Sequence, residues 1–391
     1  MSNDLSCLFP LHDVTDDHMQ KLGQALWNWK LCGACYGLSS CTKPTRPWSR
    51  AKKLLKFWDL YRNTTGTYVP ELYGGAPALR TLDDMLDIIR LIKIDPNTPT
   101  TQLTSVYFAD RTGDPGRTPV AWDQNRAFNI AASVMFMVTC GASQQCSEIL
   151  EDGHIPFPWK SDMSASSFLS QAFPMTKHPY FDTGNELSKG IDIKNLAAKY
   201  LKKKGGLRFQ ATNDLRDHLR LDHREGLVKV FHCTALLKES LLMSQADEEI
   251  PHVSGNIPRR LAIEAMDTMY EVLFPPDRKS QSFLSTLVSR HSFDEDFLRY
   301  ESSQYRKDCE QDSSFPYFGS RLAELYDELQ SPTPRGWFQP WFEKKSSARH
   351  MMMATMIRVF IAIMIGILGL GVASFQAWVA YQQWKHHMKS G

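Results

Sequence analysis

Apolar side chains recur along most of this chain at the spacing of α-helices. Residues 322–329 carry them at i, i+3, i+4 and i+7, which places them on one face of a helix. The same spacing predicts helices over residues 19–29, 82–92 and 262–273. Thr81 and Asp84 have the spacing of a capping box before the second of these. The pattern indicates a mainly α-helical body.

One short segment has the pattern of a β-hairpin instead. Residues 218–221 and 227–231 are β-prone, and the turn between them ends in Gly226. A helix is expected to follow from about Thr234. The predicted fold class is mainly α: an irregular multi-helix soluble body with a small β-hairpin at about 218–231, plus one C-terminal transmembrane helix.

The longest apolar stretch lies near the C-terminus. Residues 359–384 form a run of 26 without a formal charge, which as a helix spans about 39 Å against about 30 Å of bilayer hydrocarbon. Residues 127–142 are also uncharged, but this run of 16 contains polar side chains and is short for a span, so it predicts a buried core helix. The predicted anchor residues are Val359, Phe360, Ile361, Ile363, Ile365, Ile367, Leu368, Leu370, Val372 and Phe375.

Basic residues on either side of the apolar run predict its orientation. Five lysines and arginines lie between residues 335 and 358, and two follow the run, which favours a cytosolic body and a tail across the membrane. The first residues lack the pattern of a signal peptide. We therefore expect a tail-anchored, single-pass protein of the endoplasmic reticulum or the mitochondrial outer membrane. The predicted parts are a body at 1–330 (subdivided near 1–65, 66–185 and 186–330), a linker at 331–350, an anchor at 351–384 and a tail at 385–391.

Aromatic and small residues refine the anchor. Trp337 and Trp341 precede it in an aromatic and basic segment that predicts an interfacial collar, the alternative being that these rings pack onto the body. Small side chains at helical spacing along the anchor favour close helix–helix packing and self-association, although such residues are frequent in spans anyway. The packing face is Ala362, Gly366, Gly369 and Ala373, and the second aromatic belt is Trp378, Tyr381 and Trp384.

Three stretches of the chain carry a resemblance. Residues 211–241, then 315–357 with the PRGW motif at 334–337, then 380–387 resemble a family of uncharacterised proteins from filamentous ascomycete fungi. Members of that family end in the same proline-arginine-glycine-tryptophan segment and a single C-terminal span. The resemblance covers roughly residues 120–388 and implies a fungal source and this architecture, without a known activity.

Charge and cysteine content narrow the function classes. Lysine plus arginine number 45 and aspartate plus glutamate 43, a balance that argues against a strongly basic nucleic-acid binder. The eight cysteines are few for 391 residues and unevenly spaced, which is unlike a disulfide-stapled secreted domain and favours a reducing cytosol.

One segment of the body is locally basic. Six lysines and arginines lie between residues 43 and 56, before the next acidic residue, Asp59, and aromatic residues lie among them. They predict contact with anionic lipid headgroups, at about 1 kcal/mol each near the surface. The alternative is an amphipathic helix packed on the body with solvated lysines. The basic residues are Lys43, Arg46, Arg50, Lys52, Lys53 and Lys56.

Cys32, Cys35 and Cys41 have the best metal-like spacing in the chain. A two-residue gap lets two thiolates face one Zn²⁺, which takes four ligands. The fourth would be Cys7, His12 or His18, but a second paired motif is missing and cysteine is also an ordinary buried apolar residue. We therefore assign no metal and no cofactor, and keep a zinc or nucleic-acid module at 32–61 as an alternative.

The histidines at 218, 223 and 232 are the candidates for an enzyme. If the hairpin is right, His218 and His232 lie on its two strands, but a polar hairpin face explains them equally, with Asp222 capping its own turn. Motifs of serine hydrolases, zinc proteases and phosphate loops are missing from the sequence. The predicted function is a non-catalytic role in protein or membrane interaction, with a membrane-tethered enzyme as the alternative.

Overall fold

The chain forms two compact units, Met1–Thr333 and Pro334–Gly391. The first is the body, and the second contains one long helix. The computed structural model describes residues 9–30, 32–35, 41, 43, 46–70, 76–109, 118–141, 156–176, 178–181, 192–246, 256–290, 293–299, 305–307, 310, 315–333 and 349–387.

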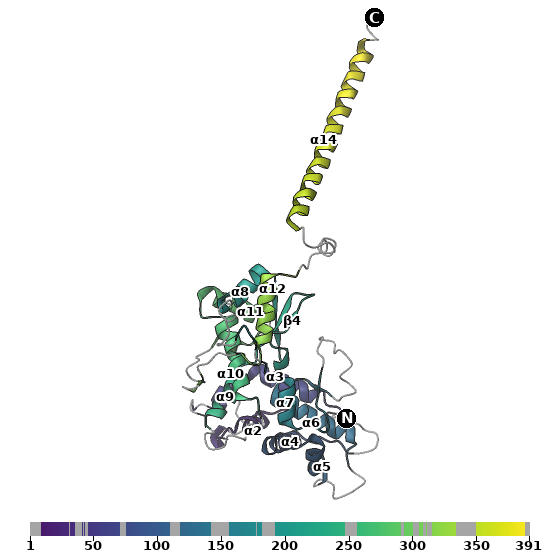
Figure 1. Ribbon diagram of the computed structural model, residues 1–391. Helices are drawn as coiled ribbons and strands as arrows, with labels where there is room; N and C mark the ends of the chain where they lie inside the picture. Colours follow the sequence, from purple (N-terminus) through teal and green to yellow (C-terminus); the bar gives the residue numbers. More distant parts are fainter. Residues whose placement is uncertain are drawn as a thin grey trace. The chain divides into compact units, whose positions relative to one another are not determined.

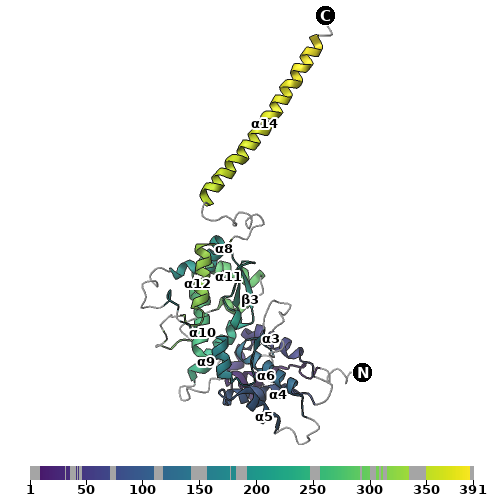
Figure 2. The same ribbon diagram turned by 45° about the vertical axis from the view of Figure 1, so that its right-hand side comes forward.

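Helices of the N-terminal half gather at one end of the body (Figures 1 and 2). The helix α2 packs on α4, α4 packs on α6, and α6 also contacts α3 and α5. Short 3-10 helices, η1 and η2, and a two-stranded parallel pair of β1 and β2 join them. The bounds are α2 (Asp16–Trp27), η1 (Gly33–Cys35), η2 (Pro47–Leu54), α3 (Leu55–Gly66), α4 (Leu82–Ile94), α5 (Thr100–Ala109), α6 (Ala121–Phe136), β1 (Cys140–Gly141), β2 (Phe157–Pro158) and α7 (Ala165–Ala172).

Helices of the C-terminal half surround a small sheet at the other end, and α9 and α10 lie between the two groups (Figures 1 and 2). The π-helix η7 continues α10 directly. The bounds are η5 (Ile193–Leu196), α8 (Ala198–Gly205), β3 (Arg208–Thr212), η6 (Leu215–Asp217), β4 (Leu221–Asp222), β5 (Leu227–Phe231), α9 (Thr234–Ala246), α10 (Arg259–Asp267), η7 (Thr268–Leu273), α11 (Arg278–Arg290), η8 (Glu295–Leu298) and α12 (Gly319–Gln330).

Local sequence signals explain where several helices begin and end. The predicted capping box is present: the Thr81 side chain accepts from the Asp84 amide, and the Asp84 carboxylate accepts from the Thr81 amide. The helix α2 ends at Asn28, whose φ of 55° is left-handed. Lys93 of α4 then donates to the carbonyl oxygens of Ala25 and Leu26 at 2.7 and 3.0 Å. A buried ammonium group therefore satisfies the end of α2.

The predicted hairpin is confirmed, with a shorter first strand and an additional partner. β4 pairs antiparallel with β5, and Gly226 takes a left-handed φ of 62° in the turn. His218 lies outside β4, directly after the 3-10 helix η6. The third strand, β3, pairs in parallel with β5 and was not predicted, because the partner of a parallel strand is set by tertiary packing rather than by a local turn.

The prediction that the uncharged run after residue 126 is a core helix is confirmed. Phe128, Ala131 and Phe136 of α6 are fully buried, and α6 packs against α3, α4, α5 and β1. In the basic segment Leu54 and Trp58 are buried, whereas Leu55 is 59% exposed. The change from the 3-10 helix η2 to the α-helix α3 between Leu54 and Leu55 rotates the faces relative to one continuous α-helix.

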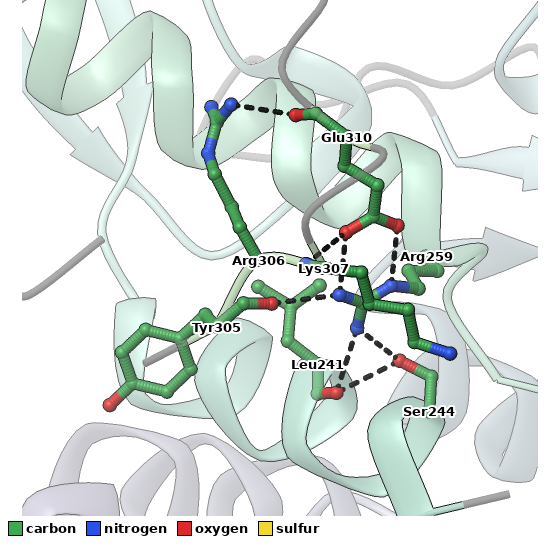
Figure 3. A network of polar contacts seen from close by, with 7 residues as sticks. All are labelled: Leu241, Ser244, Arg259, Tyr305, Arg306, Lys307 and Glu310. Carbon is green, nitrogen blue, oxygen red and sulfur yellow. Dashed lines mark hydrogen bonds and ion pairs between the residues drawn. The ribbon is translucent and has the colours of Figure 1, made fainter. Parts of the chain in front are cut away.

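A polar network connects residues 305–307 and Glu310 to α9 and α10 (Figure 3). The Arg259 guanidinium forms a bidentate pair with the Glu310 carboxylate at 2.7 Å for both contacts. It also donates to the carbonyl oxygens of Leu241, in α9, and Tyr305. The guanidinium group has five N–H donors, so the Arg259 side chain can bind acceptors from several segments at once.

The second unit contains α14, which runs from Arg349 to His387. Of the described residues, one helical segment is long and apolar enough to cross a membrane, Arg358–Gln382. The predicted collar residues Trp337 and Trp341, like most of the predicted linker, lie outside the described residues.

Candidate functional sites

The anchor residues on α14 are exposed over the whole spanning segment. From Val359 to Phe375 the ten predicted anchor side chains are each between 50% and 72% exposed. Burying a large apolar side chain stabilises by about 1.5–3 kcal/mol, so leaving ten in water would cost more than about 10 kcal/mol. Such a helix requires cover from lipid or from another helix.

The small-residue face and the distal aromatic belt lie on the same helix. A Cβ atom added at Gly366 or Gly369 would meet nothing within 4 Å, so this side of α14 is open. Trp378 and Tyr381 are exposed. The side chain of Trp384 lies outside the described residues.

The basic segment divides into exposed lysines and a buried ion pair. Lys43, Lys52 and Lys53 are exposed, whereas Arg46 and Lys56 are half-buried. Arg50 instead donates to the Glu239 carboxylate of α9, through Nε at 2.5 Å and Nη2 at 2.7 Å. This contact raises the pKa of Arg50 above its ordinary value through the hydrogen bond to Glu239. Arg50 therefore binds the segment to the body, whereas the three lysines are exposed to solvent.

The partner of Arg50 could not be identified from the sequence, because 189 residues separate Arg50 from Glu239. Glu239 lies in a helix whose other residues are mostly buried. It also accepts a hydrogen bond from Trp29 Nε1 at 3.0 Å. An acidic residue in the middle of an apolar helix was the available signal, since buried carboxylates are almost always paired.

The three cysteines at 32, 35 and 41 converge. Their Sγ atoms all lie within 4.8 Å of one another, and all three residues are buried. Cys35 Sγ donates to Cys41 Sγ at 2.9 Å. This hydrogen bond, together with burial, raises the pKa of the Cys35 thiol to about 11. Of the fourth ligands considered from the sequence, His18 hydrogen-bonds through Nε2 to Tyr61 Oη at 2.5 Å.

The three hairpin histidines do not share one site. His218 Nε2 contacts Thr268 Oγ1 at 2.7 Å, and its Nδ1 accepts from the Phe231 amide at 3.1 Å. Residue 231, rather than His232, therefore lies opposite His218. Burial lowers the pKa of His218 to about 3, so the ring is neutral at pH 7 and serves the packing of the sheet against η7.

The other two histidines point to other partners. His232 Nε2 contacts Asn213 Oδ1 at 2.9 Å, and its Nδ1 accepts from the Asp294 amide at 3.1 Å. His223 contacts carboxylates of α12, Glu324 at 2.8 Å and Glu328 at 3.2 Å. The three rings thus face different elements, and an acid–base site built from them finds no support in the described contacts.

The hairpin turn behaves as expected from its sequence. Asp222 Oδ1 accepts from the amides of Arg224 and Glu225 at 2.9 and 3.0 Å. These backbone hydrogen bonds, that from Glu225 first, lower the pKa of Asp222. The prediction that this aspartate caps its own turn is confirmed.

A cavity of about 250 Å³ lies against α3 and α6 and the segment after α6. Ligand pockets for small molecules usually measure about 300–1,000 Å³. Two of its polar side chains have partners within the body: Arg126 donates to the carbonyl oxygens of Thr67 and Val69, and Ser133 accepts from the Cys140 amide. At about 250 Å³ the cavity is smaller than the usual ligand pocket.

Comparisons with protein-family models, curated proteins and solved structures find no match to this chain.

Proposed function

We propose that this chain is a single-pass membrane protein, whose helical body is held at the bilayer by α14 and acts by binding other proteins or the membrane surface. The single observation that carries the proposal is the exposed apolar segment Arg358–Gln382. Its 25 residues span about 37 Å as a helix, enough to cross about 30 Å of hydrocarbon with some tilt.

Alkaline carbonate extraction of the full chain tests the anchor. The protein should stay in the membrane pellet, because an inserted helix resists extraction. The variant Ile363→Arg/Leu368→Arg should move to the supernatant, since each arginine at mid-span costs about 2.5–3.5 kcal/mol. Ile94→Arg is the matched control, because Ile94 is equally apolar and 71% exposed on the body. Release of the unmodified chain would refute the proposal.

Flanking basic residues support a cytosolic body. Asn63, in the sequence Asn63-Thr64-Thr65, is an exposed glycosylation acceptor on α3. If the body is cytosolic, this asparagine carries no glycan, and endoglycosidase treatment leaves the mobility of the chain unchanged. A mobility shift would contradict the proposed orientation of the body. Imaging a tagged chain then distinguishes the endoplasmic reticulum from the mitochondrial outer membrane.

Self-association through the small-residue face is part of the same proposal. Replacing Gly366 and Gly369 by leucine meets no clash within the chain, but would hold two helices apart. The Gly371→Leu variant is the control, because residue 371 lies on another side of the helix. Crosslinking in membranes should show that the dimer is lost in the Gly366→Leu/Gly369→Leu variant and kept in the Gly371→Leu variant. A dimer that is unchanged in both variants would refute self-association through this face.

Contact with anionic lipid is the expected role of the exposed lysines at 43, 52 and 53. With the full chain reconstituted in vesicles, hydrogen exchange in η2 should slow when phosphatidylserine is added. The Lys52→Glu/Lys53→Glu variant should lose this effect, whereas Lys203→Glu, an exposed lysine of α8, should keep it. Equal exchange with neutral and anionic lipid would refute the contact.

The fungal membrane-protein family remains our proposed relationship for the chain.

A further inference from the structure

Three buried thiols meet at one point near the N-terminal end of the body. Cys32 and Cys35 lie at the two ends of a single turn, in which the Cys35 amide donates to the Cys32 carbonyl oxygen at 2.9 Å. Cys41 approaches from beyond this turn, and the three Sγ atoms lie within 4.8 Å of one another. The exposed fractions of the three residues are 7%, 4% and 7%.

The spacing of the sulfurs is close to that of a thiolate metal centre. Zn–S bonds of about 2.3 Å in a tetrahedron place the sulfurs about 3.8 Å apart. Cys35 Sγ and Cys41 Sγ are 2.9 Å apart, and none of the three sulfur separations exceeds 4.8 Å. Sulfur displacements of about an ångström would therefore bring the three atoms to the separations of a zinc centre.

Packing alone does not account for the convergence. A buried cysteine behaves as a small apolar residue, and Cys233 is such a case: it is isolated and donates weakly to Asn213 Oδ1 at 3.4 Å. Cys32, Cys35 and Cys41 instead aim three polarizable sulfurs at each other. Their turn is also held from outside, because Gln20 Nε2 of α2 donates to the Cys35 carbonyl oxygen at 3.0 Å. Such support resembles the outer contacts that orient metal ligands.

We propose that Cys32, Cys35 and Cys41 bind one Zn²⁺ as thiolates, linking the 32–35 turn to Cys41. Binding releases the three thiol protons to solvent. Of the described residues, these three make up the ligand group, so the fourth tetrahedral position is taken by water or another donor. This goes beyond the membrane function, because the site would fix the fold of the body before the basic segment begins.

Zinc analysis of the full chain in detergent, purified with reductant and without chelator, tests the site. We expect about one zinc per chain, as a single centre requires. The serine variants of Cys32, Cys35 and Cys41 should each lose most of the metal, whereas Cys140→Ser and Cys233→Ser should keep it. Less than about a tenth of a zinc per chain in the unmodified protein would overturn the proposal, given the affinity of thiolate centres.

A second measurement covers the case in which the serine variants fail to fold. The unmodified chain is treated with a chelator and then titrated with Co²⁺, whose thiolate charge-transfer absorption reports sulfur ligands directly. Alkylation and mass spectrometry should show the three cysteines protected with metal and reactive without it. Absence of the cobalt–thiolate band would overturn the site. So would a Cys35–Cys41 disulfide in chains alkylated at the moment of cell lysis.

Discussion

The contact between Arg50 and Glu239 should stabilise the body, and the variant Arg50→Met tests this. In the native chain the Glu239 carboxylate is 5% exposed and accepts from Arg50 at 2.5 and 2.7 Å and from Trp29 at 3.0 Å. Methionine keeps the apolar stem of the arginine and removes both charged hydrogen bonds. A buried carboxylate then keeps only the indole donor.

The magnitude follows from burial. Removing one partner of a fully buried ion pair costs about 3–5 kcal/mol, chiefly because the other charge stays buried. Arg50 is 30% exposed, so water reaches the vacated side and reduces the penalty to about 2–3 kcal/mol. For a unit of this size, the midpoint of thermal unfolding should fall by roughly 3–4 °C.

Urea unfolding of the full chain in mild detergent, followed by tryptophan fluorescence, measures the effect. The matched control is Lys53→Met, an exposed neighbour on η2, which should change the free energy of unfolding by less than about 0.5 kcal/mol. Adding Glu239→Gln to Arg50→Met should restore about half of the loss, because the buried charge is gone. If Arg50→Met costs no more than Lys53→Met, the ion pair does not stabilise the body.

Three other substitutions follow from buried polar contacts. Lys238→Met should lower the free energy of unfolding by about 3–5 kcal/mol in the same urea assay, because Lys238 Nζ is 2.6 Å from the buried Asp296 carboxylate. A decrease smaller than that of Lys53→Met would contradict this. Lys93→Met should cost about 2–3 kcal/mol and speed hydrogen exchange at the end of α2, and unchanged exchange there would show that its carbonyl oxygens find other donors. Burial lowers the pKa of His218 to about 3, so its stabilising contribution is complete above pH 6.5 and is lost as the pH falls toward 3. His218→Gln should therefore cost about 2 kcal/mol less at pH 5 than at pH 7.5, and an equal cost would show that this ring does not titrate as described.

Local patterns predicted most of the fold because they are caused by neighbours in sequence. The capping box at Thr81 and Asp84, the start of α9 at Thr234 and the turn ending at Gly226 are all present. The lysine run of α8 is followed by Gly206, which takes a left-handed φ of 66° at the end of the helix. Each of these needs only a few adjacent residues to be satisfied, so periodicity and capping chemistry were sufficient.

Features that depend on distant partners could not be predicted. Nothing near Arg208 in the sequence indicates that β3 pairs in parallel with β5. The same holds for the contact of Arg50 with Glu239. For the candidate metal centre, the CxxC spacing indicated two ligands, but the arrival of Cys41 depends on how the chain folds back. The long apolar helix, Arg358–Gln382, was the easiest case, because an uncharged run of this length needs no partner within the chain.

Burial perturbs the pKa values of several described groups that also have hydrogen-bond partners within the body. Burial raises the pKa of Glu264 to about 7, yet its carboxylate accepts from the amides of Tyr317 and Phe318 and thereby caps the start of α12. Burial lowers the pKa of His18 to about 4, and its ring contacts Tyr61. In a catalytic site such groups face a common cleft.

Among the described residues, the perturbed carboxylates and rings are instead distributed over separate contacts between helices. The cysteine group is the exception, because its three ligand atoms face one point. A structural ion at that point would fix the turn next to the basic segment. The body could then present its exposed lysines, at 52 and 53, from a rigid surface, which is what binding to a membrane or a partner requires.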